Sequence, residues 1–223
     1  MNKLIFWDWT GTLADEAELD KAVCRRMEQD IAREAGISIE QAASRYQDYL
    51  KKREKTWRWH DYVVHCHDFG INWKSSQESH IDKLRLVPGA GDMLAYARSR
   101  GYKNILATNA VRRVIELRAA YAGIDHLLDM IIASDDVQAL KSEGRHFQRG
   151  LREWLSRPEV SFSVGDNPIQ DIRPALELGL TTVFCAYGRH LTHYHSTHIS
   201  DDHVELVCPS FSITELSDIR YII

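Results

Sequence analysis

The sequence predicts an α/β protein whose core is a mostly parallel, doubly wound sheet, interrupted by an inserted all-helical segment. Two observations predict this class. From residue 84 onward, short apolar segments alternate with helical ones, and such alternation implies right-handed crossovers between parallel strands. Residues 15–83, in contrast, have helical periodicity and no strand pattern. We therefore expect a core made of residues 1–14 and 84–223, with a helical subdomain at 15–83.

The first strand is predicted at Leu4–Trp7, where an unbroken apolar run is typical of a strand that is buried on both faces. This segment runs directly into Asp8, and the chain then bends at Gly11. Ligands of open α/β sheets bind at the carboxyl ends of the strands, which is where this arrangement places Asp8. The alternative is that Asp8 only caps the following helix or faces the solvent.

Within the inserted segment, the first helix is predicted at Ala17–Ala35, because apolar residues recur there every four positions. Ser38 and Gln41 have the spacing of a capping box, which opens a second helix that continues to about Lys55. Two more helices complete the segment, one at Thr56–Phe69 and a short one that begins at Ser75.

The remaining core elements alternate along the rest of the chain. Strands are predicted at Asn104–Ala107, Met130–Ala133, Val160–Val164 and Thr181–Cys185, with a weaker edge strand at Val204–Val207. Helices are predicted at Ala90–Arg100, Val111–Ala122, His146–Leu155 and Ile172–Leu178.

The composition argues against several classes of function. A formal net charge of −4 over 223 residues gives no signal for binding nucleic acid or an anionic membrane. No apolar segment is long enough to cross a bilayer, and the run before Asp8 is too short for the core of a signal peptide. The four cysteines are widely spaced and form no CxxC pair, which is typical of reduced cysteines in a cytoplasmic protein.

Polar residues follow each predicted core strand at its carboxyl end. They are Asp8 and Thr10 after the first strand, Thr108 and Asn109 after the second, Lys141 beyond the third, and Asp166 and Asp171 after the fourth. Because these strand ends lie along one edge of a parallel sheet, the side chains should meet there. Structural alternatives exist for each residue taken alone, such as a helix N-cap for Thr108 or a turn for Asp166. Their succession over four strands favours a functional site.

Four motifs resemble those of the haloacid dehalogenase superfamily of phosphatases and phosphotransferases, and the resemblance covers essentially the full length of the chain. The motifs are Phe6–Leu13, Ala107–Asn109, Ser134–Lys141 and Val164–Ile172, of which the last is the most specific. The resemblance implies a Rossmann-like core, a helical cap inserted after the first motif, and a covalent mechanism at an aspartate.

The resemblance also implies roles for the matched residues. Asp8 would be the nucleophile that accepts the phosphoryl group, and Lys141 would balance the charge. Thr108 and Asn109 would bind the phosphoryl oxygens. Mg²⁺ would be held by Asp8, the backbone carbonyl of Thr10 and Asp166, with support from Asp171. Elementary chemistry agrees, because Mg²⁺ prefers oxygen ligands and phosphoryl transfer needs positive charge more than acid–base chemistry.

Two residues depart from the family pattern. Phosphatases of the family usually carry a second aspartate, the general acid and base, where this chain has Thr10. Ion-pumping ATPases of the superfamily have threonine there and still form and hydrolyse an aspartyl-phosphate, so phosphoryl transfer remains the expectation. Lys141 is followed by Ser142, where family members often have proline.

Two further groups of residues are candidates for binding. The predicted cap has a basic run that ends at Arg58 and is soon followed by His60, and either residue could select an anionic substrate. A solvated helix face is the alternative. A histidine cluster follows the last predicted helix and could hold zinc or nickel, or form an ordinary polar loop: His190, His193, His195, His198 and His203.

Together these features predict a magnesium-dependent phosphatase that hydrolyses a small phosphorylated metabolite through an aspartyl-phosphate at Asp8. Two alternatives stay open. A haloacid dehalogenase would need no metal, but such enzymes generally have tyrosine where this chain has Thr10, and Asp166 belongs to a magnesium-type motif. A catalytically weak binding or regulatory protein would keep the pocket without turnover, and Thr10 is the feature that points to it.

Overall fold

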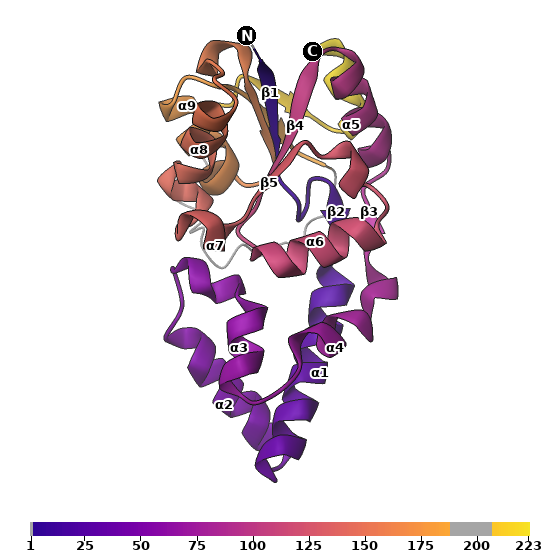
Figure 1. Ribbon diagram of the computed structural model, residues 1–223, viewed down its shortest axis with the longest axis vertical. Helices are drawn as coiled ribbons and strands as arrows, with labels where there is room; N and C mark the ends of the chain where they lie inside the picture. Colours follow the sequence, from indigo (N-terminus) through magenta and orange to yellow (C-terminus); the bar gives the residue numbers. More distant parts are fainter. Residues whose placement is uncertain (1, 188–206) are drawn as a thin grey trace.

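The structure, a computed structural model, describes residues 2–187 and 207–223. Its core is a six-stranded sheet in the order β5-β4-β1-β6-β7-β8, and every pairing in this sheet is parallel. The strands are β1 (Lys3–Trp7), β4 (Tyr102–Ala107), β5 (Met130–Ile132), β6 (Phe162–Gly165), β7 (Thr181–Cys185) and β8 (Phe211–Ile213). Figure 1 shows this sheet between helices α8 and α9 on one side and α5 on the other. The predicted doubly wound parallel sheet is therefore confirmed.

Strand β1 lies at the centre of the sheet, between β4 and β6. Its alternate side chains enter two separate hydrophobic clusters, with Ile5 and Trp7 in one and Leu4 and Phe6 in the other. Phe6 packs edge-to-face on Phe147 of α8, with the ring centroids 5.3 Å apart. The predicted burial of this strand on both faces is confirmed, and it fixes the position at which Asp8 emerges.

The core helices are α5 (Ala90–Ser99), α6 (Arg112–Tyr121), α7 (Ser134–Val137), α8 (Arg145–Glu153) and α9 (Arg173–Glu177). A π-helical turn at Pro168–Ile172 leads directly into α9, so the helix predicted at Ile172–Leu178 is preceded by a wider turn. The side-chain oxygen of Asn167 starts this turn by accepting hydrogen bonds from the amides of Ile169 and Gln170, both at 3.0 Å.

Four helices lie between the short strands β2 (Ala14–Asp15) and β3 (Arg85–Leu86), which pair antiparallel with each other. They are α1 (Ala17–Ala35), α2 (Ile39–Lys51), α3 (Tyr62–Asp68) and α4 (Trp73–Glu78). Figure 1 shows them together at the end of the molecule opposite the labelled chain ends. The chain thus leaves the core and returns to it at one place, beyond the carboxyl end of β1.

Local differences from the predicted helices have identifiable causes. The capping box of Ser38 and Gln41 is confirmed, but α2 ends at Lys51 rather than near Lys55. The predicted helix at Thr56–Phe69 is divided into a 3₁₀ turn and α3, because Asp61 caps α3 by accepting a 3.0 Å hydrogen bond from the Val64 amide. Similarly, α4 begins at Trp73 and not at Ser75, because the side chain of Asn72 caps the helix by accepting hydrogen bonds from the amides of Lys74 and Ser75.

The last strand of the sheet was not predicted. β8 has only three residues and two of them are exposed, so it has no apolar run that sequence reasoning could detect. The strand predicted at Val204–Val207 lies mostly outside the described residues, as do all five histidines of the cluster that follows α9.

Among the residues that are described, no helix is long and apolar enough to span a membrane. The four cysteines are all free thiols.

Candidate active site

A cavity of about 190 Å³ lies at the carboxyl ends of β1, β4 and β6, the edge of the sheet where the polar residues were predicted to meet. Most of the predicted site residues line it: Asp8, Thr10, Thr108, Asn109, Lys141, Asp166, Asp171 and His60. The inserted helices contribute the opposite wall, which includes Trp59 and Tyr62. The site is therefore assembled from both parts of the chain.

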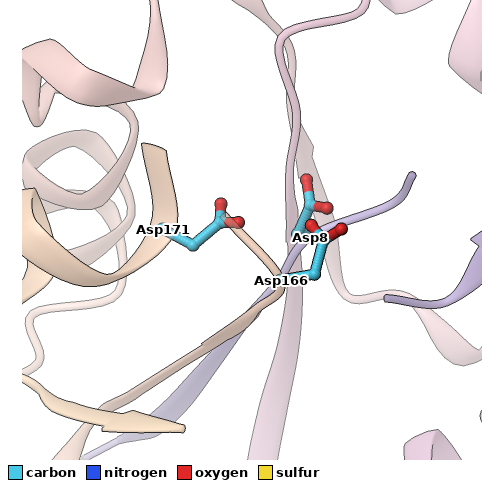
Figure 2. Close-up of side chains that lie close together, drawn as sticks. All are labelled: Asp8, Asp166 and Asp171. Atoms are coloured by element: carbon cyan, nitrogen blue, oxygen red, sulfur yellow. The ribbon is translucent and has the colours of Figure 1, made fainter. Parts of the chain in front are cut away.

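Three carboxylates form the centre of the site (Figure 2). Asp8 follows β1, Asp166 follows β6, and Asp171 lies in the π-helical turn after β6. One oxygen from each carboxylate lies within 4.8 Å of the others. Burial and repulsion from Asp171 raise the pKa of Asp8 to about 7, and burial and the other two carboxylates raise that of Asp166 well above its usual value. Such a cluster requires compensating positive charge.

Lys141 supplies part of that charge. Its ammonium group donates hydrogen bonds to Oδ1 of Asp8 and to Oδ1 of Asp171, and its side chain is almost completely buried. Burial alone would lower the pKa of Lys141, but the attraction of Asp171 and Asp8 outweighs it and keeps the ammonium charged. The lysine thus bridges the loops after β1 and β6.

The geometry of Asp166 fits a divalent cation. Its Oδ1 atom is buried and has no hydrogen-bond partner among the described residues. A buried, unpartnered carboxylate oxygen is costly, and a metal ion beside two further carboxylates would satisfy it. Gly11, at φ +79°, allows the loop after β1 to approach closely, since a Cβ atom there would collide with the Asp166 carboxylate. The donor set consists of oxygen atoms only, which suits Mg²⁺.

Thr108, at the end of β4, is held from two sides. Its hydroxyl accepts a 3.1 Å hydrogen bond from the Ala110 amide, and its carbonyl accepts one of 3.2 Å from Nε2 of His146. Burial and the nearby Lys141 lower the pKa of His146 to about 3, so this ring is neutral at physiological pH. Sequence reasoning did not single out His146, whose position on α8 gave no sign that it would reach the site.

Asn109 and Gln170 connect the loops that follow β4, β5 and β6. Asn109 Oδ1 accepts a 2.8 Å hydrogen bond from the Lys141 amide, and its Nδ2 donates to Gln170 Oε1 at 3.2 Å. The same Gln170 oxygen accepts a 2.9 Å bond from the amide of Ser142. A proline has no amide hydrogen, so it could not make this bond. Position 142 therefore needs a residue with a backbone N–H group, which Ser142 has and the proline common in the family lacks.

Thr10 is tied to a residue that the sequence did not suggest. Its hydroxyl donates a 2.7 Å hydrogen bond to Oε2 of Glu16, which lies between β2 and α1. Oε1 of Glu16 accepts bonds from Trp9 Nε1 and Arg118 Nη1, both at 2.6 Å. Glu16 is buried, which raises its pKa, while Arg118 opposes the rise. The Glu16 side chain thus places a carboxyl group beside Thr10, the position at which phosphatases of the family usually carry their second aspartate.

Arg118 connects α6 of the core with the inserted helices. Besides Glu16, its guanidinium donates to Asp20 of α1 at 2.7 Å and to Gln77 of α4 at 3.1 and 2.9 Å. The side chain is buried. Arg118 lies on the buried face of α6 together with Val114, Ile115 and Ala119, a place where arginine is rare unless it is paired. Sequence reasoning did not single it out.

The structure separates the two predicted cap residues. His60 lines the cavity, but Arg58 is exposed and is not among the residues that line it. The Arg58 guanidinium lies 4.9 Å from the ring centroid of Trp57, on the outside of the inserted helices. The structure thus places Arg58 on a solvated face, which was the alternative to a substrate contact.

Comparison with known proteins decides the family. A model of haloacid dehalogenase-like hydrolases matches residues 2–179. The chain belongs to that family. This confirms the resemblance drawn from the four motifs and identifies the protein as a hydrolase. The glyceraldehyde 3-phosphate phosphatase of Pyrococcus abyssi is 27% identical over 203 residues, which are 85% of this chain and 83% of that protein.

Solved structures of haloacid dehalogenase-like hydrolases share the fold. A HAD phosphatase from Thermococcus onnurineus has a TM-score of 0.80 at 24% identity, covering 99% of this chain and 97% of the other. A 2-haloacid dehalogenase from Pseudomonas syringae pv. tomato has a TM-score of 0.63 at 17% identity, covering 100% and 98%. Phosphatases and dehalogenases use the same fold, so the assignment between them depends on the site.

Proposed function

We propose that this hydrolase is a magnesium-dependent phosphatase that acts on a small phosphorylated metabolite through an aspartyl-phosphate at Asp8. The observation that carries the proposal is the cluster of Asp8, Asp166 and Asp171 around Lys141, with an unpartnered Asp166 oxygen. A dehalogenase site has no use for a metal-binding set of carboxylates. The similarity to a curated phosphatase over most of the chain supports the same assignment.

In the first step, a carboxylate oxygen of Asp8 attacks phosphorus, and the bond from phosphorus to the leaving oxygen breaks. The leaving oxygen keeps the electron pair, takes a proton from water and departs as an alcohol. Lys141 orients Asp8 through its hydrogen bond and offsets the negative charge at the reacting centre. Thr108 and Asn109 line the cavity where the phosphoryl oxygens would lie.

In the second step, a water molecule attacks phosphorus of the aspartyl-phosphate. The bond from phosphorus to the Asp8 oxygen breaks, which restores the carboxylate and releases inorganic phosphate. Asp8, Asp166 and the backbone carbonyl of Thr10 would hold Mg²⁺, with Asp171 in support. When bound, the ion would supply positive charge to the phosphoryl oxygens and to the crowded carboxylates.

We also propose that residues 15–83 act as a cap on this site. The segment supplies Glu16, Asp20, Trp59, His60 and Tyr62 to the cavity wall, and it connects to the core through the paired strands β2 and β3. A leaving group bound at Asp8 would be enclosed by these side chains. Enclosure excludes bulk water from the reacting centre and selects the substrate.

The proposal is tested by measuring phosphate release from p-nitrophenyl phosphate, with Mg²⁺ and with EDTA. We expect activity that EDTA abolishes, and loss of all but a trace of it in Asp8→Asn and Asp166→Ala. Asp92→Asn, which changes an exposed aspartate on α5, is the matched control and should leave the rate unchanged. Chloride release from 2-chloropropionate that persists in EDTA would instead assign the protein as a dehalogenase.

A further inference from the structure

The cavity contains few cations, and each of them already has protein partners. At the phosphoryl end, Lys141 donates to both Asp8 and Asp171, and its side chain is almost completely buried. Its charge is therefore directed at the nucleophile and at a carboxylate beside it. Two of the three ammonium hydrogens are used in these bonds, which hold the ammonium beside the nucleophile.

Arg118 is the arginine that lines the rest of the cavity. Its guanidinium donates to the carboxylates of Glu16 and Asp20 and, through two nitrogens, to the side-chain oxygen of Gln77. Four of the five guanidinium hydrogens are used in these bonds, and the side chain is buried. Arginine recognises a substrate carboxylate through two parallel hydrogen bonds, and Arg118 has no free pair of donors for one.

The wall that would enclose the leaving group is acidic. Glu16 forms an ion pair with Arg118, with Nη1 and Oε1 2.6 Å apart, and accepts two further hydrogen bonds from Trp9 and Thr10. The Asp20 side chain is 38% exposed and lines the cavity, so Arg118 neutralises only one of the two acidic residues that it contacts. Trp59, His60 and Tyr62 complete the share of the lining that the inserted segment supplies. An anionic leaving group would meet a net negative wall whose arginine is already paired, whereas a neutral or cationic one would not.

We propose that the substrate is a phosphomonoester whose leaving group carries no negative charge, that is, a phosphate ester of a neutral or amino alcohol. Esters of hydroxy acids and compounds with a second phosphate are disfavoured. The inference rests on the proposed phosphatase function, and it adds the chemical class of the substrate to it. The determinants are Glu16, Asp20 and Arg118, which lie outside the reacting centre.

Three substrates of nearly equal size isolate the charge of the leaving group: ethylene glycol monophosphate (neutral), O-phosphoethanolamine (cationic) and 2-phosphoglycolate (anionic). The measurement is kcat/KM for each, with Mg²⁺ and the full chain. We expect the first two to exceed 2-phosphoglycolate by about tenfold or more, because two like charges within a few ångströms repel even where solvent screens them partly. Equal or faster turnover of 2-phosphoglycolate would overturn the inference.

A pair of variants tests whether the acidic wall is the cause. Asp20→Asn removes one negative charge and keeps an oxygen that can accept from Arg118, so it should raise the ratio of kcat/KM for 2-phosphoglycolate to that for ethylene glycol monophosphate severalfold. Glu18→Gln makes the same change of charge on an exposed position of the same helix and should leave the ratio unchanged. If this ratio in Asp20→Asn is the same as in the native protein, the acidic wall is not the cause of the preference. Absence of turnover with all three esters and with p-nitrophenyl phosphate would instead refute the phosphatase function itself.

Discussion

The hydroxyl of Thr10 donates a hydrogen bond to Oε2 of Glu16, with the two oxygens 2.7 Å apart. Phosphatases of this family usually have an aspartate at this position, where it protonates the leaving group and activates water. Here the hydroxyl is committed to a buried carboxylate, and the other oxygen of that carboxylate is held by Trp9 and Arg118. Position 10 therefore orients its neighbours and offers no acid of suitable pKa to the substrate.

The first prediction concerns the leaving group. A positioned general acid typically contributes ~10²–10⁴-fold to the rate, and its absence affects poor leaving groups most. We expect aryl and acyl phosphates, which leave without protonation, to react much faster than alkyl phosphates of similar size. The measurement is the ratio of kcat values for p-nitrophenyl phosphate and a matched alkyl phosphate under identical Mg²⁺. A ratio near one would mean that another group in the cavity protonates the leaving oxygen.

The second prediction follows from the contact between Thr10 and Glu16. Thr10→Asp alone would place two carboxylates side by side, so we expect little or no gain on alkyl phosphates. In the double variant Thr10→Asp with Glu16→Gln, the amide can donate to the new aspartate, and alkyl turnover should rise by ~10-fold or more. Thr10→Asp with Glu18→Gln is the control of equal charge. A gain in the single variant as large as in the double one would show that Glu16 does not constrain position 10.

The third prediction tests Arg118 as a structural link between α6 and the inserted helices. Arg118→Met would leave Glu16 buried without its cationic partner, which costs about 3–5 kcal/mol for a buried pair. Urea unfolding should report this loss, whereas Arg152→Met, which changes an exposed arginine on α8 of the core, should change stability by less than about 1 kcal/mol. Adding Glu16→Gln to Arg118→Met should recover part of the loss. Equal stability of the two arginine variants would contradict the link.

The fourth prediction concerns pH in the absence of metal. Burial and Asp171 raise the pKa of Asp8 from 3.8 to about 7 in the folded protein. Between these values the folded state holds a proton that the unfolded chain releases, so the contribution of Asp8 to stability falls as pH rises from about 4 to about 7. Asp8→Asn removes this penalty and should unfold at higher urea than the native protein at pH 8 in EDTA.

The difference between the two proteins should vanish near pH 4, and Asp92→Asn should follow the native curve throughout. A native protein that is more stable than Asp8→Asn at pH 8 without metal would show that Lys141 fully compensates the cluster.

The sequence contained enough information to predict five of the six strands of the sheet and the centre of the site. The buried run before Asp8 determines a central strand, and parallel strands bring their carboxyl ends to one edge, so Asp8, Lys141 and Asp166 could be expected to meet. These inferences depend on local periodicity and on a general property of parallel sheets. Neither requires knowledge of a specific tertiary contact.

The residues that sequence reasoning missed are those whose role depends on such contacts. Glu16 and Arg118 are 102 positions apart, and no local pattern pairs them. Gln170 acts through Asn109 and Ser142, which belong to two other loops. Arg58 shows the converse, since a basic run next to His60 suggested a ligand contact, but Arg58 is exposed and its guanidinium lies beside the ring of Trp57.

The central claim is that Asp8 carries the phosphoryl group during turnover. The most direct test mixes the protein with acetyl phosphate and Mg²⁺, stops the reaction with acid on the millisecond scale, and maps the phosphorylated peptide by mass spectrometry. We predict one added phosphoryl group on the peptide that contains Asp8, and none in Asp8→Asn treated in the same way. Turnover without any phosphorylated peptide, or a phosphoryl group on another residue in native protein and variant alike, would contradict the account.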